Sequence, residues 1–310
     1  MEAGDMDDLG IVDAHHHLWD LAALRYPWLH DDPPHAFFLG DYAPLKRNYL
    51  PADYRRDAAG HRVVATVHVE AECGRDNQVG ETKWLTGVNA EHGMPNAIVA
   101  HAWFDRPNTE EVLAAHAAFP LVRGIRSKPV TGATPHDMTP GAPGTMQDDK
   151  WLAGFALLET YGLSWDLRVP TWHLREAAEV ARAFPDTRIV LNHTGFPWDR
   201  SPAGLDMWRE GMHALAACAN VDCKLSCLCL SDGPWELEGA TGNRAILLET
   251  IAIFGVDRSM FASNFPVDGL RIGYDAMFIA FKDTVAHLPR ADQEKLFAGN
   301  AARFYCVENG

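Results

Sequence analysis

The chain has 310 residues, of which 47% are apolar and 22% are charged, and its formal net charge at pH 7 is −15. This composition is typical of a globular enzyme, and the excess of carboxylates disfavours nucleic acid or an anionic membrane as a partner. No apolar run reaches the roughly 18 residues of a bilayer-spanning helix, and the acidic N-terminus does not resemble a signal peptide. We therefore expect a cytoplasmic protein that acts on a small molecule, and the composition leaves homo-oligomer formation open.

The first predicted strand, residues 11–14, leads directly into three consecutive histidines, His15, His16 and His17. Because side chains alternate along an extended chain, His15 and His17 are expected on one face and His16 on the other. Two imidazoles on one face can share a metal ion or a substrate. Histidines at strand ends are also common as hydrogen-bonded packing residues, so the pattern alone leaves both interpretations open.

Apolar, β-branched segments alternate with segments of helical periodicity along the rest of the chain. After the first strand, the predicted strands are residues 63–69, 97–103, 121–125, 163–169, 188–192, 221–225 and 260–263. The predicted helices are residues 77–91, 109–118, 150–161, 174–184, 205–217, 243–254 and 274–287. This alternation predicts a (β/α)8 barrel that occupies residues 1–310 as one domain, with a doubly wound open sheet as the alternative. No glycine-rich phosphate loop follows the first strand, which counts against a cofactor-binding open sheet.

Two connections are rich in proline and longer than ordinary loops. Residues 21–60 follow the first strand and contain five prolines among aromatic residues, and residues 129–144 follow the fourth strand. Long connections inside a compact domain often form lids or pocket walls. We expect the same role for these two segments.

Polar side chains occur at the predicted C-terminal end of every strand. In a (β/α)8 barrel these ends meet on one face, where active sites are built. Any one of the residues could serve packing or an ion pair, but their joint occurrence predicts a common polar site. In chain order they are His15 to His17, His68, Glu70, Glu72, His101, Arg123, Arg126, Lys128, Asp166, Arg168, His193, Lys224, Ser226, Asn264 and Asp268.

Seven short motifs occur in a specific order along essentially the whole chain: DAHHHLWD, YPWL, YLPADY, GIR, IVLNHTGFP, FASNFPVDG and GNAARFY. In their order and spacing the chain resembles the amidohydrolase-related superfamily. Within it, the chain is similar to the lactonase-like branch that includes sugar-lactone lactonases and 2-pyrone-4,6-dicarboxylate lactonases. The resemblance implies a (β/α)8 barrel and a hydrolase that opens a lactone, or a related ester, of a small, polar, often carboxylated molecule.

The resemblance also implies roles for individual histidines. His15 and His17 match the family's His-x-His motif on the first strand, and His193 matches its histidine at the end of the sixth. In metal-using relatives such histidines hold a divalent cation, usually zinc, whereas in some lactonases the same set binds and polarises the substrate without metal. Zinc needs three ligands and a bound water to supply hydroxide near neutral pH. One zinc ion on His15, His17 and His193 and a metal-free site are therefore both open.

The chain departs from the family pattern at the eighth strand. Where the family commonly has aspartate in Gly-Ser-Asp-Trp-Pro, residues 262–266 read Ala-Ser-Asn-Phe-Pro, which places Asn264 at the aspartate position. An amide cannot take a proton from water at neutral pH and is a poorer zinc ligand than a carboxylate. The substitution puts both the base and the metal in question. The remaining candidates for the base are Asp268, Glu70, Glu72, Asp166 and an imidazole free of metal.

These residues combine into one hypothesis for the reaction. His15, His17 and His193 polarise the scissile carbonyl, with or without zinc, while a carboxylate, Asp268 or Glu72, activates water. Asn264 orients the water or donates to the oxyanion. The predicted substrate contacts are Arg126, through a bidentate contact with a carboxylate, and Glu72, Asp166, Trp19 and Trp172. Two alternatives stay open, a metal-dependent decarboxylase or hydratase of an aromatic or unsaturated acid and a barrel that has lost catalysis.

Overall fold

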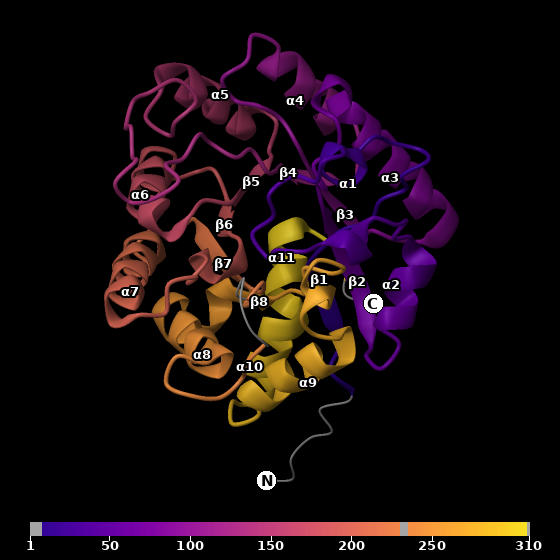
Figure 1. The fold of residues 1–310 in the computed structure, drawn as a ribbon, viewed down its shortest axis with the longest axis vertical. Helices are drawn as coiled ribbons and strands as arrows, with labels where there is room; N and C mark the ends of the chain where they lie inside the picture. Colours follow the sequence, from indigo (N-terminus) through magenta and orange to yellow (C-terminus); the bar gives the residue numbers. More distant parts are fainter. Residues whose placement is uncertain (1–7, 230–234, 309–310) are drawn as a thin grey trace.

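The computed structural model describes residues 8–229 and 235–308 of the chain (Figure 1). Parallel strands form one eight-stranded sheet in sequence order: β1 (Ile11–His16), β2 (Val63–Val69), β3 (Ala97–Ala100), β4 (Val122–Ile125), β5 (Ser164–Leu167), β6 (Ile189–Leu191), β7 (Val221–Leu225) and β8 (Ser259–Phe261). A parallel bridge between His16 and Phe265 joins the segment after β8 to β1. The sheet is therefore a nearly closed barrel, and the predicted (β/α)8 fold is confirmed.

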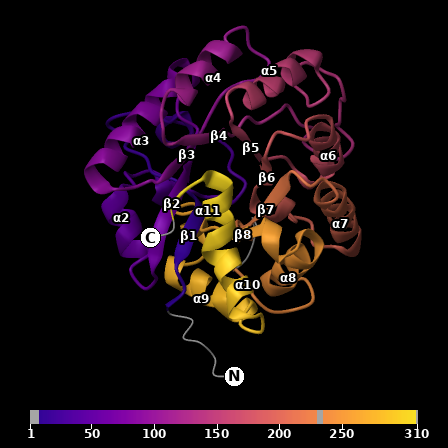
Figure 2. The ribbon, with the colours of Figure 1, turned by 180° about the vertical axis from the view of Figure 1, so that it is seen from behind.

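Helices surround the barrel (Figures 1 and 2): α3 (Gln78–His92), α4 (Thr109–Ala117), α5 (Asp149–Thr160), α6 (Leu174–Ala183), α7 (Pro202–Ala216), α8 (Asn243–Phe254) and α9 (Tyr274–Thr284). Side-chain caps define two of their starts. Asp148 accepts the Lys150 N–H at 3.1 Å before α5, and Ser201 accepts the Gly204 N–H at 3.1 Å before α7. None of the helices in the described ranges is both long and apolar enough to cross a bilayer.

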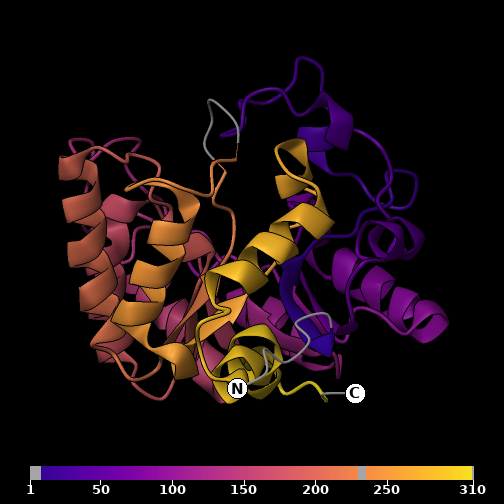
Figure 3. The ribbon, with the colours of Figure 1, turned by 90° about the horizontal axis from the view of Figure 1, so that it is seen from below.

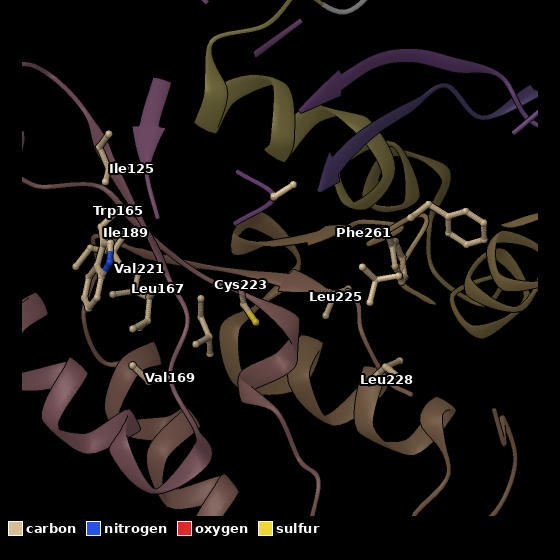
Figure 4. Close-up of a cluster of buried hydrophobic side chains, with 14 of the residues drawn as sticks. Ile125, Trp165, Leu167, Val169, Ile189, Val221, Cys223, Leu225, Leu228 and Phe261 are labelled. Atoms are coloured by element: carbon tan, nitrogen blue, oxygen red, sulfur yellow. The ribbon is translucent and has the colours of Figure 1, made fainter. Parts of the chain in front are cut away.

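A continuous apolar layer fills the space between the strands and the surrounding helices. Figure 4 shows part of this layer, with Trp165, Ile189, Val221, Leu225 and Phe261 all fully buried. Each such side chain contributes about 1.5–3 kcal/mol when it leaves water. This layer explains why the predicted strands read as nearly continuous apolar runs, because both faces of a barrel strand are covered.

The chain after α9 closes the N-terminal end of the barrel. It contains α10 (Arg290–Glu294), a π-helix (Lys295–Gly299) and α11 (Asn300–Tyr305), and both views place α11 over the middle of the ring of strands (Figures 1 and 2). Phe304 and Tyr305 pack with small residues that point into the barrel, including Val12 and Ala65. Neither α10 nor α11 is among the helices expected from the sequence, although this region closes the barrel interior.

The long connection after β1 is not a simple loop. It contains α1 (Pro27–His30) and α2 (Pro51–Asp57), and its ends are joined by backbone hydrogen bonds of 3.0 Å between Trp19 and Tyr49. The Trp28 indole N–H donates to the Ala71 carbonyl at 2.9 Å, which fastens the segment to the end of β2. Figure 3 shows the indigo part of the chain that carries α1 at one end of the barrel and the yellow C-terminal helices at the other.

A bulge in β1 determines where its histidines point. Asp13 pairs with Thr66 and His16 pairs with His68, so β1 has one residue more than β2 in this interval. Ala14 belongs to the barrel interior and the next residue, His15, also faces inward toward the site. His16 instead packs on the ring of Tyr54 in α2, with ring centroids 4.7 Å apart.

Candidate active site

A cavity of about 310 Å³ lies at the C-terminal ends of the strands. Two kinds of wall enclose it. The polar wall comes from residues at or just beyond the strand ends: His17, Glu72, Arg126, Lys128, Arg168, His193 and Asn264. The other wall is largely aromatic and comes from the connection after β1: Trp19, Trp28, His35, Phe37, Phe38 and Tyr42.

Three histidines gather at the base of this cavity. His17 and His193 line it, and His15 lies beside both, with ring centroids 5.0 Å from His17 and 4.5 Å from His193. Burial lowers the pKa of all three imidazoles well below the usual value of 6.5, and neighbouring cationic side chains lower it further. The three rings are therefore neutral at pH 7.

The proton of neutral His15 is on Nε2. Its Nδ1 lies 3.4 Å from the Nζ of Lys224, which also donates to Asp166 at 2.5 Å. An ammonium group can only donate, so His15 Nδ1 accepts and Nε2 carries the hydrogen. His15 is fully buried, and its Nε2 has no partner within the described residues. The site therefore contains an N–H donor that no protein group uses.

His17 has the opposite tautomer. Its Nδ1 lies 2.7 Å from the Val69 carbonyl, which can only accept, so Nδ1 carries the hydrogen and Nε2 carries the lone pair. That lone pair faces the side-chain oxygen of Asn264 at 3.3 Å. A water molecule beside this contact can donate a hydrogen to His17 Nε2.

Asp268 holds the amide of Asn264 in this orientation. The Asn264 Nδ2 donates to Asp268 Oδ1 at 2.7 Å, which leaves the Asn264 oxygen directed at His17. Asp268 is fully buried and is not part of the cavity lining. Burial raises its pKa from 3.8 to about 7. The structure thus places this predicted base behind Asn264 and separates its carboxyl from the cavity.

A network of alternating charges forms one side of the cavity. Arg126 donates through Nε to Glu70 Oε1 at 2.7 Å, and Arg75 donates to the other oxygen of Glu70 at 3.1 Å. Arg75 and Lys128 both form ion pairs with Glu72. Burial opposes ionisation of Glu70, but Arg126 and Arg75 outweigh it and hold the pKa of Glu70 well below its usual range. The charge of Arg126, the predicted carboxylate binder, is therefore largely matched within the protein.

The other predicted substrate contacts separate into two groups. Trp19 lines the cavity and donates its indole N–H to the Arg47 carbonyl at 2.6 Å. Asp166 and Trp172 do not line it: Asp166 is fully buried and paired with Lys224, and the Trp172 indole N–H donates to a loop carbonyl, that of Gly132, at 3.0 Å.

Several residues that line the cavity have no role among those expected from the sequence. Lys128 and Arg168 stood among the polar strand-end residues without a function, and the available signal was their position after β4 and β5. His35, Phe37 and Phe38 lie in a segment without helical or strand periodicity. Their only signal was the aromatic and proline-rich character of the long connection.

The three predicted metal ligands lie together but do not match a zinc centre. Zinc requires side chains whose lone pairs converge on one point. His15 presents a hydrogen at Nε2, and its Nδ1 is engaged by Lys224. In the two described ranges, no three His, Cys, Asp or Glu side chains are grouped in a way that could hold a metal ion.

Comparisons with known proteins agree with the fold and extend over the whole barrel. The sequence profile of the amidohydrolase family matches residues 12–307. The uncharacterized protein y4mH of Sinorhizobium fredii is 41% identical, with 97% of this chain and 100% of that protein covered. An L-fucono-1,5-lactonase of Burkholderia multivorans is 27% identical, with 96% of each chain covered.

Solved structures include an amidohydrolase from Burkholderia multivorans with bound HEPES and, in another crystal form, with bound zinc. The two structures align with TM-scores of 0.78 and 0.77 at 26% and 25% identity, covering 96% of this chain and 99% of theirs. The profile match over nearly the full length, the eight-stranded barrel and the polar site at its C-terminal face lead to one conclusion. This chain is an enzyme that belongs to the amidohydrolase family.

Proposed function

We propose that this enzyme hydrolyses the ring ester of a small, polar lactone, with His17 as the base that activates water. The observation that carries the proposal is the pair of acceptors, His17 Nε2 and Asn264 Oδ1, which face each other at 3.3 Å at the cavity wall. Both atoms accept hydrogen bonds, and a water molecule in the cavity can donate one hydrogen to His17 Nε2 beside Asn264 Oδ1. The full-length similarity to L-fucono-1,5-lactonase, at 27% identity, supports lactone hydrolysis as the reaction class.

In the proposed reaction, a water molecule held at His17 beside Asn264 attacks the lactone carbonyl while His17 Nε2 takes one of its protons. The hydrogen bond from His17 Nδ1 to the Val69 carbonyl orients the ring throughout. The His193 ring, which lines the cavity, supplies a donor for the developing oxyanion, and the His15 ring with its unpaired Nε2 lies beside it. When the carbon–oxygen bond of the ring breaks, His17 returns the proton to the leaving alkoxide, and the product is a hydroxy acid.

No step of this reaction passes through a metal ion, because the tautomer of His15 and the amide at position 264 fit a substrate better than zinc. Elemental analysis of protein purified without added metal, combined with turnover after chelation, tests this choice. We expect turnover that is unchanged by chelation at a metal content far below one ion per chain. Turnover that is lost on chelation and restored by zinc would instead make the histidines metal ligands.

A panel of five- and six-membered lactones, followed by proton release in weakly buffered solution, tests the reaction class. His17→Asn should reduce kcat by about 10²–10⁴ on any lactone that the wild-type protein hydrolyses, since that is the usual contribution of a general base. The exposed His213 on α7 provides the matched control, and His213→Asn should keep wild-type turnover. Release of carbon dioxide from an aromatic acid, with no lactone consumed, would contradict lactone hydrolysis and indicate a decarboxylase.

A further inference from the structure

Two cysteines lie beside the buried carboxyl of Asp268, behind the cavity wall that carries Asn264. Cys227 and Cys229 follow β7, and both are buried. Their thiols are hydrogen-bonding neighbours of the Asp268 carboxyl. Asp268 Oδ1 accepts from Asn264, whereas its buried Oδ2 forms no hydrogen bond with an N–H or O–H group of the described residues. The two thiols are therefore the donors available to the second oxygen.

The backbone of Cys227 relates it to the residues that build the cavity. Its φ is +51°, in the left-handed region that residues other than glycine rarely adopt. Glu72, His193 and Asn264 have the same conformation after their own strands, and all three line the cavity. Such strained residues gather at functional sites, where the surrounding structure holds them. Cys227 shares this conformation although its side chain lies behind the cavity wall.

Both thiols keep their hydrogens near neutral pH. Burial and then Asp268 raise the pKa of the Cys227 and Cys229 thiols, and burial outweighs the nearby guanidinium groups, which are those of Arg168, Arg200 and Arg271. A donor stabilises the ionised form of a carboxyl. The two thiols, with Asn264 and the nearby Cys227 N–H, accordingly lower the pKa of Asp268, which burial nevertheless raises to about 7.

The charge of Asp268 decides which way the Asn264 amide points. An ionised carboxyl only accepts, so it takes the Nδ2 hydrogen and leaves Asn264 Oδ1 directed at His17 Nε2, 3.3 Å away. A protonated carboxyl can donate to the amide oxygen instead, and the amide would then turn its N–H groups toward His17. The His17 lone pair would accept one of these hydrogens and could not take a proton from water.

We propose that Cys227 and Cys229 are positioning residues, whose thiols hold Asp268 as a carboxylate that fixes the Asn264 amide and keeps the His17 lone pair free for water. This inference rests on the proposed function for the role of His17. None of the seven sequence motifs contains either cysteine. Cys223, a third thiol in this part of the chain, lies on β7 in the apolar layer (Figure 4).

The pH dependence of turnover tests the positioning role. Cys227→Ala and Cys229→Ala each remove one donor to the carboxylate, so the acidic limb of kcat should move to higher pH by about 0.5–1 unit, with KM nearly unchanged. At pH 6 this shift lowers kcat by about three- to tenfold, and at pH 9 kcat should return to the wild-type value. Cys227→Ser keeps a hydroxyl donor and should keep the wild-type profile. Equal losses of kcat at pH 6 and pH 9 would overturn the proposal.

Cys223→Ala is the matched control for these variants. Cys223 is fully buried like the other two cysteines, but it packs among the apolar side chains of Figure 4. Cys223→Ala should therefore keep the wild-type pH profile of kcat. The same shift of the acidic limb in Cys223→Ala would mean that loss of any buried thiol causes it, and would contradict a specific role of the other two.

Infrared spectra of the S–H stretch separate this inference from the reaction class, because they need no substrate. An S–H group that donates to a carboxylate forms a stronger hydrogen bond than one beside a neutral carboxyl, so its band lies at lower frequency. Between pH 5 and pH 9, the wild-type protein and Cys223→Ala should show this band shift. Asp268→Asn should not show it, and Cys229→Ala should show less of it.

The two possible failures are therefore distinguishable. An S–H band in the wild-type protein that does not change with pH would overturn the role of the thiols even if lactones are hydrolysed. A pH-dependent band that disappears in Asp268→Asn would support the contact between the thiols and Asp268 even if no tested lactone turns over, and the reaction class alone would then be wrong.

Discussion

At the scale of single residues, the site depends on which hydrogen bonds leave a donor or an acceptor free. Val69 takes the Nδ1 hydrogen of His17, and Lys224 occupies the Nδ1 lone pair of His15. These two contacts give adjacent imidazoles opposite functions, with a lone pair on one Nε2 and a hydrogen on the other. Asp268 holds the Asn264 amide through the hydrogen bond from Asn264 Nδ2, and we propose that it positions Asn264 and does not itself take the proton.

Asp268→Asn tests this distinction. If Asp268 only orients Asn264 through the 2.7 Å hydrogen bond, its loss should lower kcat by about tenfold and leave KM nearly unchanged, well short of the loss in His17→Asn. Steady-state kinetics of the two variants on one substrate makes the comparison. A loss for Asp268→Asn as large as that for His17→Asn would return Asp268 to the role of base.

Glu81 provides a second prediction at this scale, away from the site. It is buried in α3, accepts the Ala71 N–H at 3.0 Å, and has a pKa raised by burial and then by Glu70 from 4.5 to about 8. Between these two pH values the folded state keeps a proton that the unfolded state releases, so folding stability falls as pH rises. Glu81→Gln has no carboxyl at this position and should not show this fall in stability. Its free energy of unfolding, measured in urea, should rise relative to wild type by about 1 kcal/mol or more between pH 5 and pH 8.

The exposed Glu91, near the end of the same helix, is the control for this pH dependence. Glu91→Gln should follow the wild-type stability at both pH values. If the Glu81→Gln and wild-type curves run parallel from pH 5 to pH 8, the carboxyl of Glu81 does not titrate in this window.

At the scale of elements, small irregularities in the strands and their connections decide which side chains reach the site. The extra residue in β1 turns His15 inward directly after the inward-facing Ala14. Without that bulge, strict alternation would direct His15 away from the barrel interior. The connection after β1 then covers the site, because Trp19 and Trp28 fasten it to the barrel by hydrogen bonds.

Two glycines in helices should respond to alanine with opposite changes in stability. A Cβ at Gly154 in α5 would overlap the backbone carbonyl of Phe104, whereas a Cβ at Gly87 in α3 would meet no atom within 4 Å. Gly154→Ala should therefore lower the free energy of unfolding by about 1–3 kcal/mol through overpacking. Gly87→Ala should raise it by about 0.5–1 kcal/mol, since alanine favours the helix. Urea denaturation of both variants checks the signs, and two shifts in the same direction would contradict the packing of α5.

At the scale of the whole molecule, a line of polar contacts passes through the barrel. The Tyr305 hydroxyl donates to Asp166 at 2.9 Å, Asp166 pairs with Lys224, and Lys224 reaches His15. This line links α11, which closes one end of the barrel, to the site at the other. The chain as a whole carries a net charge of −15, but the cavity is locally positive, so the arrangement of charges decides which ligand it suits.

Replacing Lys224 should destabilise the folded protein, because Asp166 would remain as a buried charge without its counterion. Lys224→Met should lower the free energy of unfolding by about 3–5 kcal/mol. The double variant Lys224→Met with Asp166→Leu removes both charges and should recover much of that loss. Urea denaturation of the two single variants and the double variant measures the coupling, and strictly additive losses would contradict the ion pair.

The sequence by itself determined the alternation of strands and helices, the barrel, the family, and the strand ends that carry polar residues. These features depend on local periodicity and short motifs, which the linear chain displays directly. The helices α10 and α11 were not predicted, because a segment that closes a barrel end has no periodic signal of its own.

Only the tertiary structure decided how the polar residues are paired. Glu70 lies 56 positions before Arg126 and neutralises it, which leaves Arg168 as the cavity-lining cation without an ion-pair partner in the described residues. Asp268 lies behind Asn264, and Asp166 pairs with Lys224 inside the barrel. Whether a charged side chain meets a substrate or a counterion depends on contacts between distant segments, and spacing along the chain does not encode those contacts.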